Sequence, residues 1–348
     1  MTHTASLHSP RVSVIMSVYN GDQYLREAIV SILAQTFADF EFIIIDDGST
    51  DRSVEIVESF DDPRIRPILN SGNLGLATSL NKGLELARGD YIARMDCDDI
   101  SLPARLERQV AFLDGHPGIG LCGTWLRYSG VNAGKVVRYP SEPELIRAGF
   151  LFNPVVAHPT VMYRRKLFDR HGLRYDPACQ RSQDYELWAR ALANVAFSNL
   201  PEVLFLYRLH PAQVSSAFNA QQLETAGRVR RSLLNGLGLE PSAEDFETHQ
   251  RLSIYLVNGE RELFARADEW LCRLKEANDR AKVYQEPYFS LALTERLMTL
   301  LKKMLEQKVV PKGFMLRPRL FQVTGLGWGS VLKFFLQSRR GKVTISHA

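Results

Sequence analysis

The sequence predicts an α/β protein: a mostly parallel sheet flanked by helices, followed by a helical C-terminal region. Over the first hundred residues, apolar β-branched runs alternate with segments of helical spacing, which is the pattern of consecutive β-α units. Acidic residues directly follow the second and the fourth of these runs. From about residue 215 onward the patterns are helical. These three observations favour a doubly wound sheet with right-handed crossovers and a separate helical part.

The first half of the expected sheet consists of four strands joined by three helical segments. The first strand is bounded by Pro10 and by the turn-forming pair Asn20-Gly21, and Gly89 ends the last of the three helices. The strands are expected at 11–18, 41–45, 65–69 and 91–95, and the helical segments at 22–33, around 54–57 and at 76–87. No Gly-x-Gly-x-x-Gly sequence follows the first strand, which disfavours a dinucleotide-binding enzyme.

The later part of the sheet is less regular. A helix from Arg105 leads to a strand at 119–126, and a loop with two prolines then feeds a further strand. Helices are expected at 164–170 and 182–192, a last strand at 203–209, and long helices at 221–237, 243–258, 260–276 and 284–308. We expect His158 in the loop and Trp188 in the helix at 182–192 to serve structure rather than chemistry.

Charge and cysteine content indicate in which compartment the protein works and which partners it could bind. The formal net charge is +4, and residues 311–348 hold seven Lys or Arg and no acid, so this tail carries more than the whole excess. The four cysteines are isolated, which argues against a disulfide framework or a zinc knuckle and fits a reducing compartment. The first ten residues lack the apolar core of a signal peptide, and the apolar stretch 320–332 is too short to span a bilayer.

The stretch 87–103 holds the strongest candidate site. A short apolar strand ends in Asp96, Asp98 and Asp99, and Pro103 suits the first turn of a following helix. Carboxylates packed this closely repel one another, so an Asp-x-Asp sequence at the carboxyl end of a strand fits a metal cradle. The alternative is a helix N-cap, because acids also favour the positive end of a helix dipole.

Five motifs occur in a fixed order along the chain. They are Val14-Ile15-Met16-Ser17-Val18-Tyr19-Asn20, Ile45-Asp46-Asp47-Gly48-Ser49-Thr50-Asp51, Gly72-Asn73-Leu74-Gly75, Asn81-Lys82-Gly83 and Asp96-Cys97-Asp98-Asp99. In this order and at these separations they resemble family 2 glycosyltransferases of the GT-A (Rossmann-like) fold, over residues 11 to about 210. The resemblance implies an enzyme that uses a nucleotide-diphosphate sugar as its donor.

The resemblance also implies which residues contact the donor. Tyr19 would lie against the base, Asp47 would accept a hydrogen bond from the base edge, and Ser17 would support this pocket. Asn73 belongs to the turn-rich loop of the donor site, and Asp96 would hold hydroxyls of the ribose or the sugar. Without the other motifs, Tyr19 would be interpreted as a turn aromatic and Asp47 as an Asx-turn residue.

By the same resemblance, Asp98 would bind the cation that bridges the two phosphates. His210, the last residue of Tyr207-Arg208-Leu209-His210, would be a further contact to the metal or the diphosphate. Oxygen ligands with one imidazole suit Mn²⁺ or Mg²⁺ rather than zinc. Asp184 in Gln183-Asp184 matches the general base of the family's Glu-Asp motif, although Gln replaces the commoner acid. The alternatives are a structural histidine for His210 and a helix N-cap for Asp184.

These observations divide the chain into four parts. They are a disordered N-terminus at 1–10, a GT-A glycosyltransferase domain at 11–214 with a donor-binding half (11–100) and an acceptor half (101–214), a helical C-terminal domain at 215–310, and a basic amphipathic tail at 311–348. The tail mixes its cations with Phe, Leu and Trp, which suits anionic lipid headgroups, and a solvated tail is the alternative.

We therefore expect a metal-dependent, inverting glycosyltransferase. Its donor would be a nucleotide-diphosphate sugar, with UDP as the default, and its acceptor a hydroxyl of a surface glycan or a lipid-linked saccharide, as in polysaccharide, O-antigen or lipopolysaccharide synthesis. We expect a cytoplasmic protein with peripheral contact at the inner face of the membrane. No nucleic acid partner is expected, because no recognised module accompanies the charge. The alternative is a catalytically inactive sugar-nucleotide or glycan-binding protein of the same fold.

Overall fold

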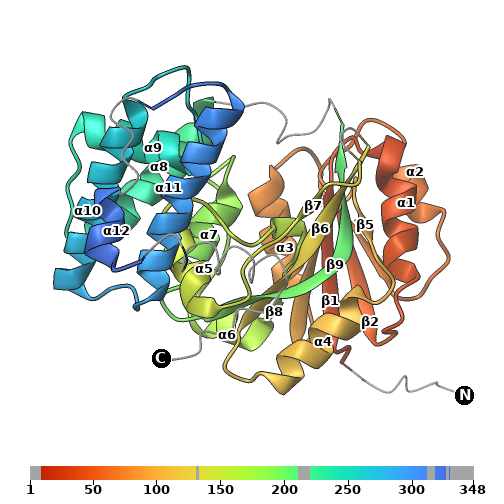
Figure 1. The fold of residues 1–348 in the computed structure, drawn as a ribbon. Helices are drawn as coiled ribbons and strands as arrows, with labels where there is room; N and C mark the ends of the chain where they lie inside the picture. The colour runs from red at the N-terminus through yellow and green to blue at the C-terminus, as the bar shows by residue number, and fades with distance from the viewer. Residues whose placement is uncertain (1–8, 131–132, 211–219, 312–317, 327–328, 330–348) are drawn as a thin grey trace, which may run out of the picture. The chain divides into compact units, whose positions relative to one another are not determined.

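The computed structural model describes residues 9–130, 133–210, 220–311, 318–326 and 329. The chain divides into two compact units, Met1–Tyr139 with Val156–Gln222, and Pro140–Val155 with Leu223–Ala348. The first contains the sheet and the second consists of helices (Figure 1), so we call them the sheet unit and the helical unit. Most of the expected N-terminal segment at 1–10 and most of the expected basic tail lie outside the described residues.

A single nine-stranded sheet forms the centre of the sheet unit. Its strand order is β3-β2-β1-β4-β8-β6-β9-β5, with β7 paired to β6. The strands are β1 (Val12–Val18), β2 (Phe40–Asp46), β3 (Ile65–Leu69), β4 (Tyr91–Asp96), β5 (Ile100–Ser101), β6 (Leu121–Gly130), β7 (Val136–Val137), β8 (Met162–Arg164) and β9 (Phe197–Leu209). The parallel pairing of β1 with β2 and β4, and of β2 with β3, confirms the four predicted strands. The other half is mixed, because β8 runs antiparallel between β4 and β6.

Helices cover both faces of this sheet, which confirms the α/β class (Figure 1). They are α1 (Asp22–Leu33), α2 (Ser53–Glu58), α3 (Leu76–Leu86), α4 (Arg105–Gly115), a 3₁₀ turn (His158–Thr160), α6 (Arg165–Arg170) and α7 (Gln183–Ala191). On one face, α1 and α4 share a core with Val14 and Met16 of β1. On the other face α3 packs at Gly83, where a Cβ atom would lie 2.7 Å from Ile15 and 2.9 Å from Ile45. Glycine therefore lets α3 lie directly on the strands.

The last strand is longer than the sequence predicts. β9 begins at Phe197 rather than at Val203, and its ladder with β6 shifts register next to Thr124. Pro201 lies at this irregularity. Proline has no N–H group for the ladder and is tolerated in a sheet mainly at edges and bulges, which explains the shift. The proline also interrupts the apolar pattern, so the sequence indicates only the part of the strand that follows it.

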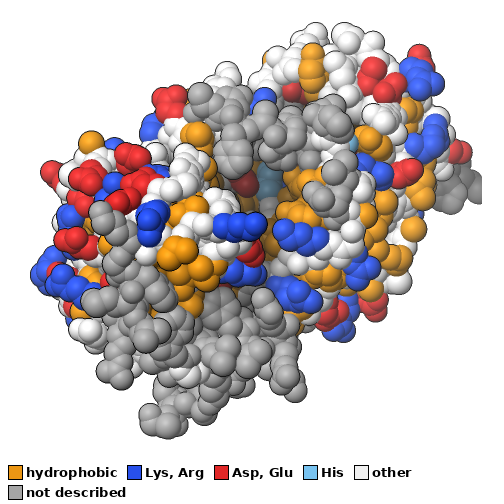
Figure 2. Space-filling model, turned by 45° about the horizontal axis from the view of Figure 1, so that its top comes forward, with side chains coloured by type: hydrophobic (Ala, Val, Ile, Leu, Met, Phe, Trp, Pro, Cys, Tyr) orange, Lys and Arg blue, Asp and Glu red, His pale blue; other side chains and the backbone are white. Residues whose placement is uncertain are grey.

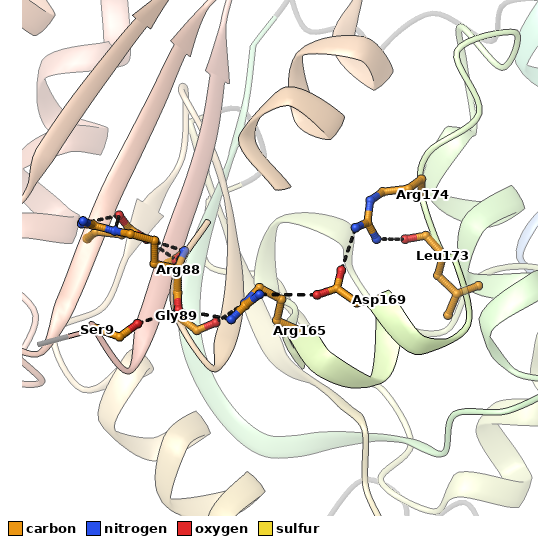
Figure 3. A network of polar contacts seen from close by, with 9 residues as sticks. Ser9, Arg88, Gly89, Arg165, Asp169, Leu173 and Arg174 are labelled. Carbon is orange, nitrogen blue, oxygen red and sulfur yellow. Dashed lines mark hydrogen bonds and ion pairs between the residues drawn. The ribbon is translucent and has the colours of Figure 1, made fainter. Parts of the chain in front are cut away.

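A polar network holds the amino-terminal end of β4 (Figure 3). Nε of Arg165 in α6 donates to the carbonyl oxygen of Gly89 at 2.6 Å. Arg165 also pairs with Asp169, which binds Arg174 at 2.6 Å. On the other side, Arg88 forms an ion pair with the buried carboxylate of Glu41 in β2. The network joins the turn before β4 to α6 and to β2, at the opposite end of the strand from the acidic loop, so its role is structural.

The helical unit contains the long helices expected beyond residue 215. Its described helices are α5 (Pro143–Gly149), α8 (Ala220–Gly236), α9 (Ala243–Ile254), α10 (Leu263–Ala281), α11 (Tyr288–Glu306) and α12 (Arg319–Thr324). The sequence places residues 140–155 in the acceptor half, whereas Leu145 and Ala148 of α5 pack into the core of the helical unit. The carboxylate of Asp268 in α10 accepts hydrogen bonds from the first backbone N–H groups of α12. None of the described helices is both long and apolar enough to cross a membrane.

Candidate active site

An acidic loop forms where β4 ends. Asp96 is the last residue of β4, and Asp98 and Asp99 follow in the turn that leads to β5. One carboxylate oxygen from each of the three lies within 4.8 Å of the others. Burial raises the pKa of Asp98, and the charge of Asp96 raises it further. Burial and the charges of both neighbours raise the pKa of Asp99 well above its ordinary value. A cation between the three carboxylates would relieve their mutual repulsion.

His210 reaches the acidic loop from the end of β9. Its Nε2 atom lies 3.0 Å from Oδ2 of Asp98. The contact depends on the antiparallel pairing of β5 with β9, in which Ile100 lies opposite Leu206. This pairing holds the residues that follow Leu206 next to those that precede Ile100. The structure therefore brings together the two side chains that the sequence nominates for a metal.

The oxygen donors of this loop fit a hard divalent cation. Oδ1 of Asp99 accepts a hydrogen bond from the backbone N–H of Arg208 at 2.7 Å, whereas its Oδ2 is buried without a hydrogen-bond partner among the described residues. A buried carboxylate oxygen without a donor is unfavourable, and a nearby cation would compensate it. Carboxylate oxygens with one imidazole suit Mn²⁺ or Mg²⁺. The contact between Asp98 and His210 puts a carboxylate and an imidazole side by side at this loop.

Asp184 is the second residue of α7, and its pKa responds to the charges around the acidic loop. The residue before α7, Ser182, has a φ of 54°, and the helix starts directly after it. Burial raises the pKa of Asp184, and the charge of Asp96 acts in the same direction. A hydrogen bond from the backbone of Tyr185 and the charge of Arg94 oppose this rise. A carboxyl group with a raised pKa is suited to accept a proton near neutral pH.

Arg94 supports the acidic loop from within β4. Its side chain is almost fully buried and forms an ion pair with Asp96, and its Nε has no partner among the described residues. Burial lowers the pKa of His158, and the positive charge of Arg94 lowers it further. The same charge opposes the rise in the pKa of Asp184, so Arg94 lies within electrostatic reach of both. Arg94 is not among the site residues predicted from the sequence. The available signal was a charged residue inside an otherwise apolar central strand, a place where arginine is rare unless it is paired.

The expected donor residues of β1 lie at the carboxyl end of the strand. Ser17 is buried, and in the parallel register it lies opposite Ile45 of β2 and Asp96 of β4. Tyr19 follows the strand, and 49% of its surface is exposed. Ser17 is therefore part of the floor beside the acidic loop, and Tyr19 is accessible to a ligand.

The carboxylate of Asp47 is already engaged within the protein. It accepts hydrogen bonds from the backbone N–H groups of Leu74 at 3.0 Å and Gly75 at 2.9 Å, and from the side chains of Asn70 and Ser79 at 2.8 Å each. Three of these hydrogen bonds end on Oδ1 and one on Oδ2, so the carboxylate is engaged mainly through Oδ1. Asp47 therefore holds the loop 70–75 in place. No hydrogen bond or ion pair within the described chain joins Asp47 to the acidic loop.

Asn73 lies on the same loop. It is exposed, and its Oδ1 accepts a hydrogen bond from the backbone N–H of Gly75 at 3.0 Å. The turn considered for Asp47 is formed instead by Asp46, whose Oδ1 accepts from the N–H of Gly48 at 3.1 Å. Gly48 has a φ of 76°, and a Cβ atom there would lie 2.5 Å from the backbone of Gly72. Glycine thus allows the loops after β2 and β3 to touch.

His158 and Trp188, which we expect to serve structure, both lie among aromatic side chains. Nε2 of His158 lies 2.8 Å from the hydroxyl of Tyr175. Trp188 is fully buried, and its ring makes edge contacts with Tyr163 and Phe197. Together they form an aromatic cluster between α7 and the sheet.

The chain is similar to a known enzyme family over the region that carries the acidic loop. Residues 13–172 match the family model described as glycosyl transferase family 2. An uncharacterized glycosyltransferase from Haemophilus influenzae is 35% identical over 247 residues, which covers 66% of this chain and 76% of that protein. The O-antigen biosynthesis glycosyltransferase WbnJ of Escherichia coli is 35% identical over 212 residues, covering 57% of this chain and 80% of WbnJ.

Two solved structures share the fold. One is S. aureus TarS 1–349 in complex with UDP-GlcNAc, with a TM-score of 0.58 and 17% identity over 86% of this chain and 92% of the other. The second is the mannosyltransferase PcManGT from Pyrobaculum calidifontis in complex with GDP-Man and Mn²⁺. Its TM-score is 0.51 at 19% identity, and the match covers 87% of this chain and 89% of that one.

Proposed function

Because the chain belongs to glycosyl transferase family 2, we propose that it moves a sugar from a nucleoside-diphosphate donor to a hydroxyl group of a glycan, with inversion at the anomeric carbon. The observation that carries this proposal is the contact between His210 and Asp98 in the acidic loop. This contact supplies the chemistry of a metal ligand pair. The proposal adds a second carboxylate, Asp184, whose raised pKa suits proton transfer.

In the proposed reaction, Asp184 accepts the proton of the acceptor hydroxyl. The acceptor oxygen attacks the anomeric carbon from the face opposite the diphosphate, and the bond from that carbon to the diphosphate oxygen breaks. The electron pair of this bond leaves with the nucleoside diphosphate. Asp98 and His210 would hold a divalent cation, which when bound offsets negative charge on the departing diphosphate.

The donor would lie along the carboxyl ends of β1, β2 and β4. Tyr19 is exposed enough to lie against a base, Ser17 would support the pocket from below, and Asp96 would bind ribose or sugar hydroxyls. Asp47, with its carboxylate engaged, would act mainly by holding the loop on which Asn73 lies. TarS and PcManGT were solved with UDP-GlcNAc and GDP-Man, so UDP and GDP sugars are the first donors to test.

The acceptor we propose is a cell-surface saccharide, free or linked to a lipid, because a relative acts in O-antigen biosynthesis. The basic residues of 311–348 would bring the enzyme to an anionic membrane surface, apart from α12, whose Leu320 is buried in the core of the helical unit. A nucleic acid partner is not part of the proposal. Figure 2 shows both basic and acidic side chains on the described surface of one face, and no recognised nucleic-acid-binding module accompanies the basic ones.

The test is donor turnover by the purified protein. UDP and GDP sugars are first screened by thermal shift with and without Mn²⁺, and the donors that bind are then assayed for transfer to a panel of glycans. We expect metal-stimulated release of the nucleoside diphosphate with formation of a glycosidic bond. Donor binding that persists without turnover across the whole panel would overturn the proposal and favour a sugar-nucleotide-binding protein of the same fold.

A further inference from the structure

Asp98 is held at two places, its side chain and its backbone. His210 contacts the carboxylate, and the guanidinium of Arg208 contacts the backbone: Nε donates to the carbonyl oxygen of Asp98 at 2.9 Å. The backbone N–H of Arg208 also donates to Oδ1 of Asp99 at 2.7 Å. One residue of β9 therefore binds two consecutive residues of the acidic loop, through its side chain and through its main chain.

Tyr24 of α1 lies between Arg208 and His210. The guanidinium of Arg208 lies over the Tyr24 ring at 4.5 Å from its centroid, and the centroid of the His210 ring lies 4.9 Å from that of Tyr24. The four residues Asp98, Arg208, Tyr24 and His210 thus form a closed ring of contacts. Each member touches two others, and the ring joins α1, the acidic loop and the end of β9.

We infer that Arg208 and Tyr24 are positioning residues, which hold the carboxylate of Asp98 and the imidazole of His210 in the geometry of a ligand pair before a cation binds. The inference rests on the proposed function, because it assigns these two residues a task at the proposed metal site. Groups that orient metal ligands are needed for full affinity, and their loss typically weakens metal binding by about 10- to 100-fold.

The contacts require arginine rather than lysine. The planar guanidinium donates from Nε to the carbonyl of Asp98, stacks its face on Tyr24, and donates from its terminal nitrogen to Glu27 at 2.6 Å. An ammonium group can replace the charge but not this combination of directions. The pair with Glu27 is the least important contact, because the Glu27 side chain is 62% exposed and such pairs contribute little.

The closed set of contacts among Asp98, Arg208, Tyr24 and His210 also explains how the imidazole is oriented without a metal. β9 ends at Leu209, so His210 lies beyond the last ladder position of the strand. Its ring is in contact with Asp98 on one side and with Tyr24 on the other. Removing Tyr24 or Arg208 would leave His210 with fewer constraints, so that binding a cation would have to order it.

The test is the affinity for Mn²⁺, measured by electron paramagnetic resonance of the free ion with saturating UDP, or GDP if UDP does not bind. We expect Arg208→Ala and Tyr24→Leu each to weaken Mn²⁺ binding by about 10- to 100-fold. Tyr24→Phe keeps the ring and should bind like the wild type, because no side-chain hydrogen bond of the Tyr24 hydroxyl is found in the described structure. Arg208→Lys should lie in between, since it keeps only the charge.

The matched control is Arg108→Ala. This residue of α4 also forms an ion pair with a β9 residue, Glu202. Both side chains lie at the surface, and neither belongs to the four residues around Asp98. Its Mn²⁺ affinity should equal that of the wild type. Circular dichroism and the midpoint of thermal unfolding verify folding. If Arg208→Ala does not fold, the Mn²⁺ affinity of Tyr24→Leu compared with that of Tyr24→Phe still tests the positioning role.

The two possible failures are distinguishable. If the wild type binds no Mn²⁺ with either nucleotide, the metal-dependent function proposed above is wrong. If the wild type binds Mn²⁺ and the folded variants Arg208→Ala and Tyr24→Leu bind it equally well, the function stands and the inferred positioning role is wrong.

Discussion

The Nε2 atom of His210 lies 3.0 Å from a carboxylate oxygen of Asp98, although 112 positions separate the two residues in the chain. The short antiparallel pairing of β5 with β9 brings them together. Asp98 shares its loop with Asp96, and the charge of Asp96 raises the pKa of Asp184. The imidazole of His210 and the carboxylates of the acidic loop thus meet near the carboxyl end of β4, where open α/β sheets bind their ligands.

Replacing Asp184 by Asn removes a proton acceptor and changes the shape of the side chain little. We expect kcat for sugar transfer to fall by about 100- to 10,000-fold, the range for loss of a general base, with donor affinity unchanged. The measurements are turnover with a glycan acceptor and calorimetric titration with the donor. Glu186→Gln is the control, because this half-buried residue of the same helix pairs with Arg190 and, among the described residues, has no hydrogen bond or ion pair with the acidic loop, so kcat should stay nearly unchanged. Equal losses in the two variants would contradict the role of Asp184.

The pH dependence of kcat should report the same carboxylate. A base must be deprotonated to act, so kcat should fall as the pH drops through the pKa of Asp184, which lies above the ordinary value of about 3.9. Arg94→Met removes a positive charge that lowers this pKa, so the acid limb of the profile should move to higher pH. Arg94→Lys keeps the charge and should leave the limb close to its wild-type position. An acid limb that stays fixed in Arg94→Met would show that another group limits kcat.

Asp47→Ala should destabilise the protein, because it removes the acceptor of four hydrogen bonds, three from the loop 70–75 and one from Ser79 of α3. We expect a loss of about 2–4 kcal/mol in the free energy of unfolding, measured by urea titration. Glu202→Ala, which removes an exposed ion pair with Arg108, should cost no more than about 1 kcal/mol. Similar costs for both variants would mean that the four hydrogen bonds of Asp47 add little stability.

Gly83→Ala should also destabilise the protein, although alanine is the better helix former. The added Cβ atom would lie 2.7 Å from Ile15 and 2.9 Å from Ile45. Overpacking of this kind costs about 1–3 kcal/mol, which outweighs a gain of up to about 1 kcal/mol in helix propensity. Gly236→Ala at the end of α8 is the matched control, because nothing lies within 4 Å of its added Cβ. It should be neutral or stabilising in the same urea titration. A neutral Gly83→Ala would show that α3 can move away from the strands.

The first half of the sheet could be predicted because each of its strands carries a local signal. β1 and β2 are buried along their whole length, and their sequences are therefore mostly apolar and β-branched. The later strands lack such a signal. β5 and β7 are two residues long, and Pro201 interrupts β9. Their pairing depends on contacts between distant segments, which no local pattern encodes.

The candidate site was predictable only in part, for a similar reason. Asp98 and His210 were nominated through the resemblance to a family, and their contact follows from the ladder between β5 and β9. Arg208 and Tyr24 were not nominated, because an arginine near a strand end and a tyrosine in an amphipathic helix are common in any protein. Their task is visible only when the distances among them are known.

The most direct measurement is the position of Mn²⁺ in crystals grown with the nucleotide that binds, located by anomalous scattering. We expect one ion bonded to the carboxylate of Asp98 and the imidazole of His210, with the carboxylate of Asp184 facing the same site from the acceptor side. An ion bound elsewhere, or Asp98 and Asp184 opening onto different surfaces, would contradict this expectation.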